Sequence, residues 1–398
     1  MNKNYLTLFI EISNSHVSFL VGEKNDYGNF KLKFKTDMPS NGIEDNKIFD
    51  LEKAFNLFKE NIYLIEQKFQ YTFREIILIL DHFNPSFVSV SGFKKLNGSQ
   101  VLKENITYIL NSLKSYINEI ESKKTILHIF NSKFSLDNKK VFNLPIGLFG
   151  DFYCHELSFT LIKTTDFKNL ENIFSKCNLK IKKILLKSFV SGVNISENNK
   201  SLENFFNIKI NENFTKIFYF ENDSLKFEQE FKFGSDIIVR DISKITSIKK
   251  ETVINILEKI EFSENMSDED LVEKDFFKED IYKKIKKKLV FEIAFARIKE
   301  ISEILLFKNI NFKHHNNFSR NIFLEIANLT KLKSLKKIYK LTFSTNKNIQ
   351  VNFLNYLNSE SLLKTADKLV HFGWNKEAIP ISSPKKSIIT RFFESIFG

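Results

Sequence analysis

The chain has 398 residues, of which 42% are hydrophobic and 27% are charged. This composition fits a folded protein with room for two or more domains and excludes a disordered chain. No apolar run approaches the roughly 18 residues of a membrane span, no signal-peptide core opens the chain, and Cys154 and Cys177 lack metal-ligand spacing, as expected in a reducing cytoplasm.

The net charge is +12, which is compatible with nucleic acid or an anionic membrane as partner. The chain also contains 44 Phe but only 11 Gly and 5 Pro, and it is visibly rich in Lys, Asn and Ile. This pattern is typical of a genome biased to A and T. Charge and aromatic content alone therefore do not identify a partner.

The first part of the chain predicts an α/β layer. Two strands, at residues 5–12 and 16–23, join at Ser13-Asn14-Ser15, and a third strand follows at 30–36. A helix with an apolar periodicity spans 49–69, and a short buried strand spans 75–81. A hairpin, a helix and a buried strand in this order favour a layered α/β domain.

A second unit follows in the order strand, helix, strand, strand. It comprises residues 86–94, 100–120, 125–136 and 152–163. This unit is small enough to be an insertion. The chain then returns to the main body through a helix at 166–177 and a segment at 181–193.

The second half repeats the hairpin-rich pattern, which implies an internal duplication. Its predicted elements are strands at 208–220, 226–233 and 321–326 and helices at 235–245, 282–306, 329–339 and 361–372. For the long helix at 282–306 the periodicity predicts a core face, formed by Leu289, Ile293, Ala296, Ile301 and Leu305.

The last fifteen residues form an amphipathic pattern. Apolar pairs recur every four residues, which makes one stripe on a helix. Ser383 is suited to the N-cap and Pro384 to the first helical position. The helix is too short to span a bilayer but suited to its interface, and docking on the protein's own core is the alternative. The residues predicted to contact a membrane are Lys385, Lys386, Ile388, Ile389, Arg391, Phe392, Phe393, Ile396 and Phe397.

Several runs, taken in order, resemble the bacterial cell-division protein family FtsA of the actin/Hsp70-like superfamily. They cover most of the chain, and the family also ends in an amphipathic helix after a linker. The runs are Phe9 to Ile12 with Val17 to Glu23, Thr125 to Ile129, Asn143 to Gly150, Asp166 to Ile195, Gly234 with Arg240 to Ile242, and Ala296 to Ile301.

This resemblance implies an α/β, actin-like ATPase fold with duplicated RNase H-like halves, an inserted strand–helix–strand–strand (SHS2, or 1C) subdomain and a C-terminal amphipathic helix. The implied domains are subdomain 1A at 1–84 and 165–195, the insertion at 85–164, and a second domain at 196–374 that includes subdomain 2B at about 245–310. A linker at 375–383 and the membrane-targeting helix at 384–398 complete the chain.

The family binds ATP with magnesium between two phosphate hairpins and a glycine-rich turn. The matching residues here are Ser13, Asn14, Ser15, Asn211, Asn213, Gly234, Glu325 and Ala327. The glycines that let the backbone approach phosphate are missing from all three loops. We therefore expect a degenerate ATPase fold without catalytic residues or a metal, and not an enzyme.

The resemblance implies a scaffold that links FtsZ polymers to the cytoplasmic face of the inner membrane at the division septum. Implied partners are the acidic FtsZ C-terminal tail, anionic lipids, other division proteins and a second copy in an actin-like filament, with no nucleic acid. Subdomain 2B receives the FtsZ tail in the family, so basic residues there are candidates for docking. They are Lys283, Lys284, Lys286, Lys287, Lys288 and Arg297.

Three rival functions are separable. A PilM-like component of a pilus or secretion assembly shares the inserted subdomain but lacks this membrane tail. A sugar-kinase-like enzyme needs an acidic base and glycine loops that are absent here. A basic nucleic-acid binder would show a steep salt dependence of DNA affinity.

Overall fold

A computed structural model describes residues 5–378 except 14, 26–29, 45–46, 82, 200–201, 261–266, 268, 279, 313–320, 328–331, 333, 345–348 and 355–357. The chain divides into two compact units, residues 1–190 with 363–398 and residues 191–362. Each is described separately. Among the described residues, no helix combines the length and apolar character needed to cross a membrane.

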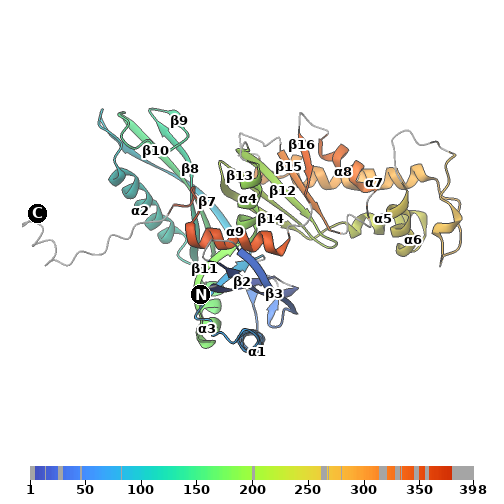
Figure 1. Ribbon diagram of the computed structural model, residues 1–398. Helices are drawn as coiled ribbons and strands as arrows, with labels where there is room; N and C mark the ends of the chain where they lie inside the picture. The colour runs from blue at the N-terminus through green and yellow to red at the C-terminus, as the bar shows by residue number, and fades with distance from the viewer. Residues whose placement is uncertain are drawn as a thin grey trace, which may run out of the picture. The chain divides into compact units, whose positions relative to one another are not determined.

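The first unit is built on a five-stranded sheet with the strand order β11-β6-β1-β2-β3 (Figure 1). Strands β1 to β3 form an antiparallel meander, while β6 and β11 run parallel to β1. The central strands β1 and β6 are apolar and mostly buried, whereas the edge strand β3 alternates Phe or Leu with Lys, with one face half-buried and the other exposed. The bounds are Tyr5–Ile12 (β1), His16–Lys24 (β2), Phe30–Pro39 (β3), Glu75–Leu80 (β6) and Lys180–Leu186 (β11).

Two helices of this unit, α1 (Leu51–Phe69) and α3 (Thr164–Lys176), pack against each other through Phe58 and Phe174, whose ring centroids lie 4.9 Å apart. The side chain of Asp50 caps α1 by accepting from the Lys53 amide. The remaining elements are β4 (Ile43–Glu44), β5 (Lys47–Ile48), α4 (Lys187–Asn198), within which the unit boundary falls, and α9 (Ser359–Phe372).

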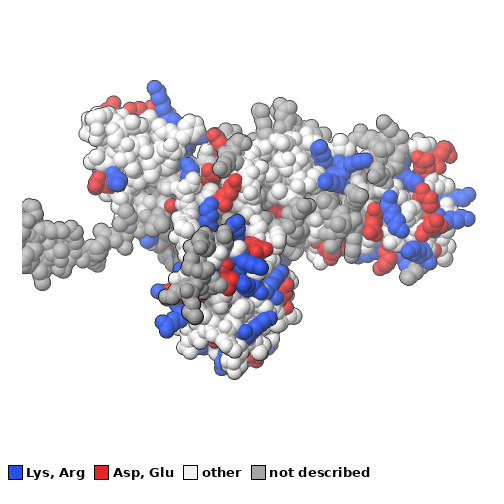
Figure 2. Space-filling view, viewed as in Figure 1, with Lys and Arg blue, Asp and Glu red and all other residues white. Residues whose placement is uncertain are grey.

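The insertion between β6 and α3 is a subdomain with its own sheet, in the order β7-β10-β8-β9, covered by α2. Leu110 and Ile117 of α2 pack on Leu157 and Phe159 of β10. In Figure 2, the visible face of the inserted subdomain has a broad area without charged side chains. The bounds are Ser86–Lys95 (β7), Lys103–Ile120 (α2), Lys124–Leu136 (β8), Lys139–Val141 (β9) and Phe152–Lys163 (β10). The predicted strand–helix–strand–strand order is therefore present, with a short extra strand.

The second unit repeats the first sheet, with the order β14-β13-β12-β15-β16. Strands β12, β13 and β14 form an antiparallel meander, and β15 and β16 run parallel to β12. Two sheets of one topology confirm the predicted internal duplication and the actin-like fold class. The strands are Asn204–Ile210 (β12), Thr215–Glu221 (β13), Ser224–Phe231 (β14), Asn321–Ile326 (β15) and Gln350–Phe353 (β16).

The helices of the second unit are α5 (Asp236–Thr246), α6 (Lys250–Lys259), α7 (Lys287–Ser302) and α8 (Leu335–Ser344). Short 3-10 turns lie at Lys274–Phe276 and Ile310–Phe312, and a π turn at Glu303–Phe307 extends α7. Together these elements cover one continuous apolar core with the strands of the sheet.

The structure corrects the long helix predicted at 282–306. α7 begins only at Lys287, because the preceding segment is extended: Lys286 bridges to Leu271, and the Val272 amide donates to the Ile285 carbonyl at 2.8 Å. The predicted core face is also wrong at three positions. Leu289, Ile293 and Ala296 are not in the buried stripe, which consists of Val290, Ala294, Ile298, Ile301 and Leu305.

Candidate functional site

The carboxyl ends of β1 and β6 hold a cluster of three charged side chains. The Lys187 ammonium, at the start of α4, lies 2.5 Å from Glu11 Oε1 and 2.8 Å from Asp81 Oδ2. Burial alone would lower the pKa of Lys187, but the two carboxylates outweigh it and raise the pKa. Glu11 and Asp81 thus share one counter-charge that the chain itself supplies. This cluster was not predicted, because 106 positions separate Asp81 from Lys187 and no local pattern links them.

The first predicted phosphate loop is closed by its own polar groups. The amide and the hydroxyl of Ser13 both donate to the His16 carbonyl, at 3.0 and 2.7 Å. The Ser15 hydroxyl lies 2.9 Å from His16 Nδ1. Asn14 lies outside the described residues. Ser13 is buried and its donors are used within the hairpin, so it does not present them to a phosphate.

The second loop corresponds to the first by strand register. Ile12 pairs with Leu80 in the first sheet as Ile210 pairs with Ile326 in the second, and both hairpins close with one amide-to-carbonyl bond. Lys209 therefore occupies the place of Glu11. The second unit thus carries a positive side chain where the first unit carries a carboxylate.

The start of α5 is turned toward this loop. Its Ser235 and Asp236 amides donate to the carbonyls of Asn211 and Glu212, at 2.8 and 3.0 Å. A Cβ on Gly234 would lie 2.2 Å from the Asn211 carbonyl oxygen, so the approach requires glycine. The helix N-terminus, an anion-binding position in other folds, is occupied by carbonyl groups of the loop. Asn213 is an exposed residue of the same turn.

The third predicted loop follows β15. The Glu325 carboxylate is buried and accepts a hydrogen bond from the Asn207 amide group at 2.9 Å. The next turn residue, Ala327, donates its amide to the Ile210 carbonyl at 2.8 Å. Glu325 thus joins two neighbouring strands, and Ala327 continues their ladder.

These loops do not fit ATP with magnesium. The amide donors named above are bound to carbonyls of the chain, Lys187 lies between two carboxylates, and Lys209 stands in the second unit at the place of Glu11. In the described part of the chain, no group of three or more His, Cys, Asp or Glu side chains is placed to hold a metal ion.

The segment before the tail is docked on the inserted subdomain. Residues 376–378, which the sequence placed in a linker, pair with β8: Asn131 donates to the Lys376 carbonyl and Ala378 to the Ile129 carbonyl, both at 2.7 Å. We call this segment the strap. The Ala378 side chain enters the apolar cluster between α2 and the sheet.

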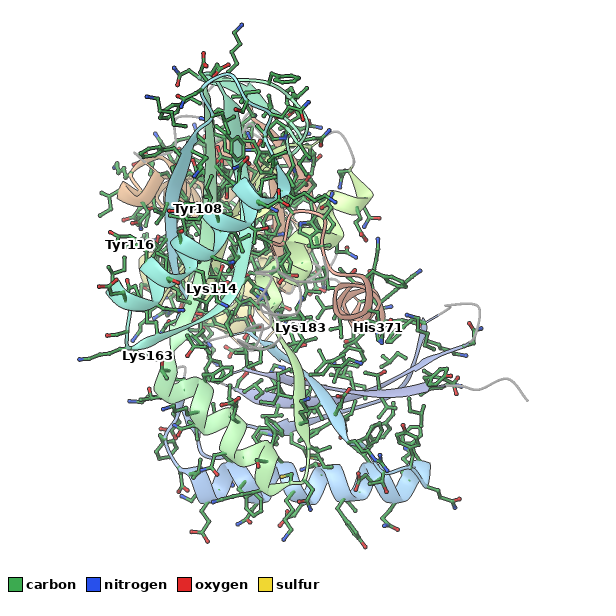
Figure 3. All side chains as sticks on the ribbon, turned by 90° about the vertical axis from the view of Figure 1, so that its left-hand side faces the viewer. Tyr108, Lys114, Tyr116, Lys163, Lys183 and His371 are labelled. Atoms are coloured by element: carbon green, nitrogen blue, oxygen red, sulfur yellow. The ribbon has the colours of Figure 1, made fainter. Side chains whose placement is uncertain are left out.

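Glu377, in the middle of the strap, is held by two basic side chains. His128 Nδ1 of β8 donates to it at 3.0 Å, and the Lys183 ammonium of β11, labelled in Figure 3, donates at 2.8 Å. Burial would raise the pKa of Glu377, but the bond from His128 and the charges of His128 and Lys183 lower it to about 2. The strap therefore connects the inserted subdomain with the main sheet of its unit. The predicted membrane residues, Lys385 to Phe397, lie outside the described residues.

The predicted docking lysines do not share one helix face. Lys283 donates to the Ser247 carbonyl, Lys284 and Lys286 are exposed on the extended segment, and Lys287 pairs with Glu273 at 2.6 Å in the first turn of α7, where Lys288 follows. Arg297 pairs with Asp241 and Glu300 of its own unit.

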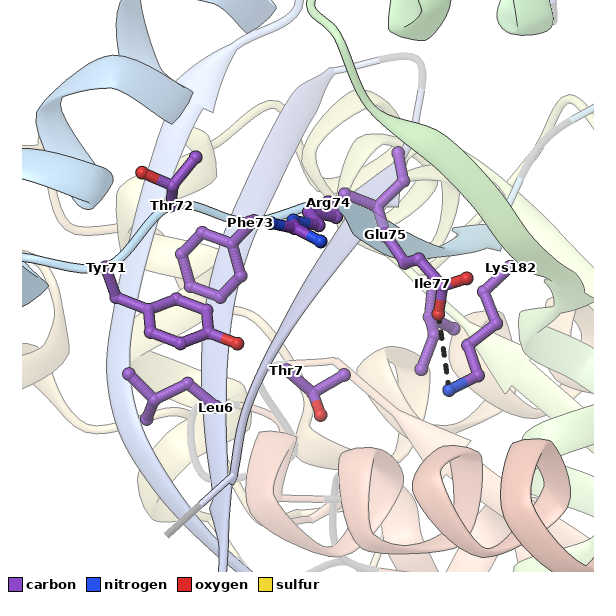
Figure 4. A pocket seen from close by; sticks show the side chains of 10 residues that line it. Leu6, Thr7, Tyr71, Thr72, Phe73, Arg74, Glu75, Ile77 and Lys182 are labelled. Atoms are coloured by element: carbon purple, nitrogen blue, oxygen red, sulfur yellow. Dashed lines mark ion pairs between the residues drawn. The ribbon is translucent and has the colours of Figure 1, made fainter. Parts of the chain in front are cut away.

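A pocket of about 580 Å³ opens at the other end of the first sheet (Figure 4). Leu6 and Thr7 of β1, Phe73 and Arg74 before β6, and Lys182 of β11 contribute to its lining. It lies at the amino ends of β1 and β6, whereas the phosphate-loop positions lie at the carboxyl ends, where open α/β sheets bind ligands. The predicted site residues do not line it.

Comparisons with known proteins agree with the fold described above. No family model matches the chain. The chain is similar over 92% of its length to a chain of the PilM-PilN type IV pilus biogenesis complex, of which the match covers 98%, with 10% identity and a TM-score of 0.53. That likeness and the duplicated topology define the class as proteins of the actin-like ATPase fold.

Within this class, the chain resembles the cell division protein FtsA. It is 22% identical over 238 residues to FtsA of Buchnera aphidicola subsp. Schizaphis graminum (strain Sg), which is 60% of this chain and 56% of the relative. It is 22% identical over 251 residues to FtsA of Buchnera aphidicola subsp. Acyrthosiphon pisum (strain APS), 63% of this chain and 60% of the relative. The matches thus span under two thirds of the relatives' length, and over that part the chain is similar to FtsA.

Proposed function

We propose that the chain is a cell-division scaffold that ties FtsZ polymers to the cytoplasmic face of the bacterial inner membrane at the septum. The observation that carries the proposal is the similarity to two FtsA proteins. The actin-like fold with its inserted subdomain, and the amphipathic sequence from Pro384 to Gly398, support it.

The proposal includes a role in binding and not in catalysis. The Lys187 cluster and the loops at Ser13 and Asn211 support this, since the backbone amides described there already donate to carbonyls of the chain and a lysine lies between the carboxylates. The scaffold's affinity would come from the tail and from many copies acting together. Self-association and further division proteins as partners belong to the same proposal.

The acidic FtsZ tail would dock in the second unit. Lys284 and Lys286 have exposed side chains on one extended segment, which suits an acidic peptide better than Arg297, whose charge is already paired within the unit. Charge opposition of this kind chiefly raises the association rate and makes it dependent on salt.

The tether is tested by co-sedimentation of the full chain and FtsZ with vesicles containing phosphatidylglycerol. Fully burying one Phe is worth about 1.5–3 kcal/mol, so replacing two at the centre of the stripe should weaken vesicle binding by ~100-fold or more. The variant is Phe392→Glu with Phe393→Glu, and FtsZ should remain in the supernatant with it.

The matched control is Tyr63→Glu with Leu64→Glu, because these two α1 side chains are 59% and 61% exposed. It should sediment like the unmodified chain. If the Phe392/Phe393 variant binds vesicles as tightly as the unmodified chain, the tail is not the membrane anchor. If the unmodified chain sediments with vesicles but FtsZ does not, FtsZ is not its partner.

A PilM-like role in a pilus or secretion assembly is the second candidate. The structural similarity to the PilM-PilN complex favours it. Titrations with FtsZ and with PilN separate the two, because only one of them should bind.

A further inference from the structure

The inserted subdomain carries an exposed apolar loop that its own fold does not use. Between β9 and β10, large apolar side chains point to solvent, with exposed fractions of 68% for Phe142, 52% for Leu148 and 69% for Phe149. Leu144, Ile146 and the neighbouring Leu102 are exposed as well. We call these six residues the apolar loop patch.

The patch is built by the backbone. The Gly147 amide donates to the Val101 carbonyl, and the Val101 amide donates to the Leu148 carbonyl, both at 2.9 Å. The Leu148 amide closes a turn by donating to the Pro145 carbonyl at 3.1 Å. The loop is thus fixed with its apolar side chains outward. Contiguous exposed apolar surface of this kind usually marks an interaction site.

Basic residues flank the patch. No charged residue occurs from 142 to 150, whereas Lys139 and Lys140 precede this run and Lys103 follows Leu102. Acidic residues also lie near the patch: Asp137 is exposed, although its carboxylate accepts from the Asp151 and Phe152 amides at 2.8 Å, and Glu104 and Asp151 are exposed. An apolar patch beside lysines suits the interface of an anionic bilayer.

The strap docks on the inserted subdomain beside Phe142 of the patch, and from Lys376 to Ala378 it runs antiparallel to β8. The Lys376 ammonium lies 3.5 Å from the Phe142 carbonyl, so the strap begins beside the patch. Only five residues, 379–383, separate Ala378 from Pro384. Five residues span at most roughly 18 Å when fully extended. A tail helix lying on a membrane therefore keeps that membrane near the inserted subdomain.

We propose that the apolar loop patch is a second membrane contact, which enters the bilayer interface together with the tail. The proposal rests on the membrane role of the tail proposed above. Two contacts joined by a short tether bind more tightly than either alone, because the second contact is made at high local concentration. They also fix how the inserted subdomain faces the lipid.

A fluorescence measurement reports the contact directly. Phe149→Trp is placed in a Trp374→Phe background, so that it is the only tryptophan of the chain. On vesicles with phosphatidylglycerol its emission should shift to the blue, and brominated lipids should quench it. If the emission stays that of an exposed indole while the chain sediments with the vesicles, the proposal is overturned.

An affinity measurement separates the patch from the tail. Leu148→Ser with Phe149→Ser should weaken vesicle binding by ~10-fold, since partly immersed side chains realise only part of their transfer energy. The matched control is Tyr63→Ser with Leu64→Ser on α1, with melting temperatures confirming that both variants fold. If the Leu148/Phe149 variant binds vesicles as tightly as the control variant, the patch is not a membrane contact. If the variant keeps its lipid affinity but no longer self-associates in sedimentation, the patch contacts a second copy of the chain, and the proposal is also overturned. If the Phe392/Phe393 variant stays bound to vesicles, that result contradicts the role of the tail and not the role of the patch.

Discussion

Three charged side chains, Glu11, Asp81 and Lys187, determine the electrostatics at the carboxyl ends of β1 and β6. Two carboxylates at the carboxyl ends of parallel strands are suited to a cation, and Lys187 supplies one. Sequence reasoning found the missing glycines around Ser13 and Asn211, because loop residues can be read locally. It missed Lys187 and Lys209, since their roles depend on strand register.

Replacing Lys187 by Met should lower the free energy of unfolding by about 3–5 kcal/mol at neutral pH, because two part-buried carboxylates lose their counter-charge. The deficit should shrink as pH falls, because protonation of a carboxylate removes the charge that lost its partner. Urea denaturation measures both effects. The control is Lys182→Met, whose exposed pair with Glu75 at 3.5 Å is worth at most about 1 kcal/mol. Equal losses in the two variants would contradict a special role for Lys187.

At the scale of elements, prediction succeeded where a segment's own pattern dominates. The residues of β1, α1 and β10 were found from apolar periodicity and strand alternation. It failed for Tyr282 to Lys286, which pair with a distant extended segment, and for the strap, whose three residues carry no strand pattern. Both errors have one cause: the hydrogen-bond partner lies far away in the chain.

The strap should open when Glu377 loses its charge. Its pKa is about 2 in the folded chain against 4.5 ordinarily, so the ion pairs stabilise the strap above about pH 4.5 and are lost as pH falls through 2. This difference corresponds to about 3 kcal/mol. At neutral pH, Glu377→Gln should therefore speed hydrogen exchange of the Ala378 amide by up to ~100-fold.

Exchange at Ala378 is followed by NMR or mass spectrometry, with Glu75→Gln as the control. Glu75 is half-exposed and pairs only loosely with Lys182. If Ala378 exchanges equally slowly in both variants, the backbone pairing with β8 holds the strap without Glu377.

Over the whole molecule, the internal duplication was predictable because both hairpin-rich halves keep their apolar strands. The helices of the second unit were harder to predict. The helix α7 begins at Lys287 and not at Tyr282, and its buried side chains differ from the predicted ones. The two units share one topology but differ in charge at the place of Glu11 and Lys209. The two units therefore share a fold, but the loops at equivalent positions carry different charges.

Titration of the full chain with ATP and magnesium should give no heat of binding beyond dilution. The reason lies in both units, since the backbone amides of Ser13, Asn211, Ser235 and Asp236 already donate to carbonyls of the chain. Isothermal calorimetry checks this, with magnesium chloride alone as the reference. A dissociation constant in the micromolar range would contradict it and would require the loops to rearrange.

The ammonium of Lys187 is covalently part of the chain, so its place between Glu11 and Asp81 is filled in every folded molecule. A dissolved ion would come and go with its concentration, and a nucleotide would be consumed and replaced. A lysine does neither, and its raised pKa keeps it charged at any pH a cell reaches. In the proposed scaffold this cluster would therefore not change with nucleotide or ion concentration, and the timing of assembly would be set by the partners.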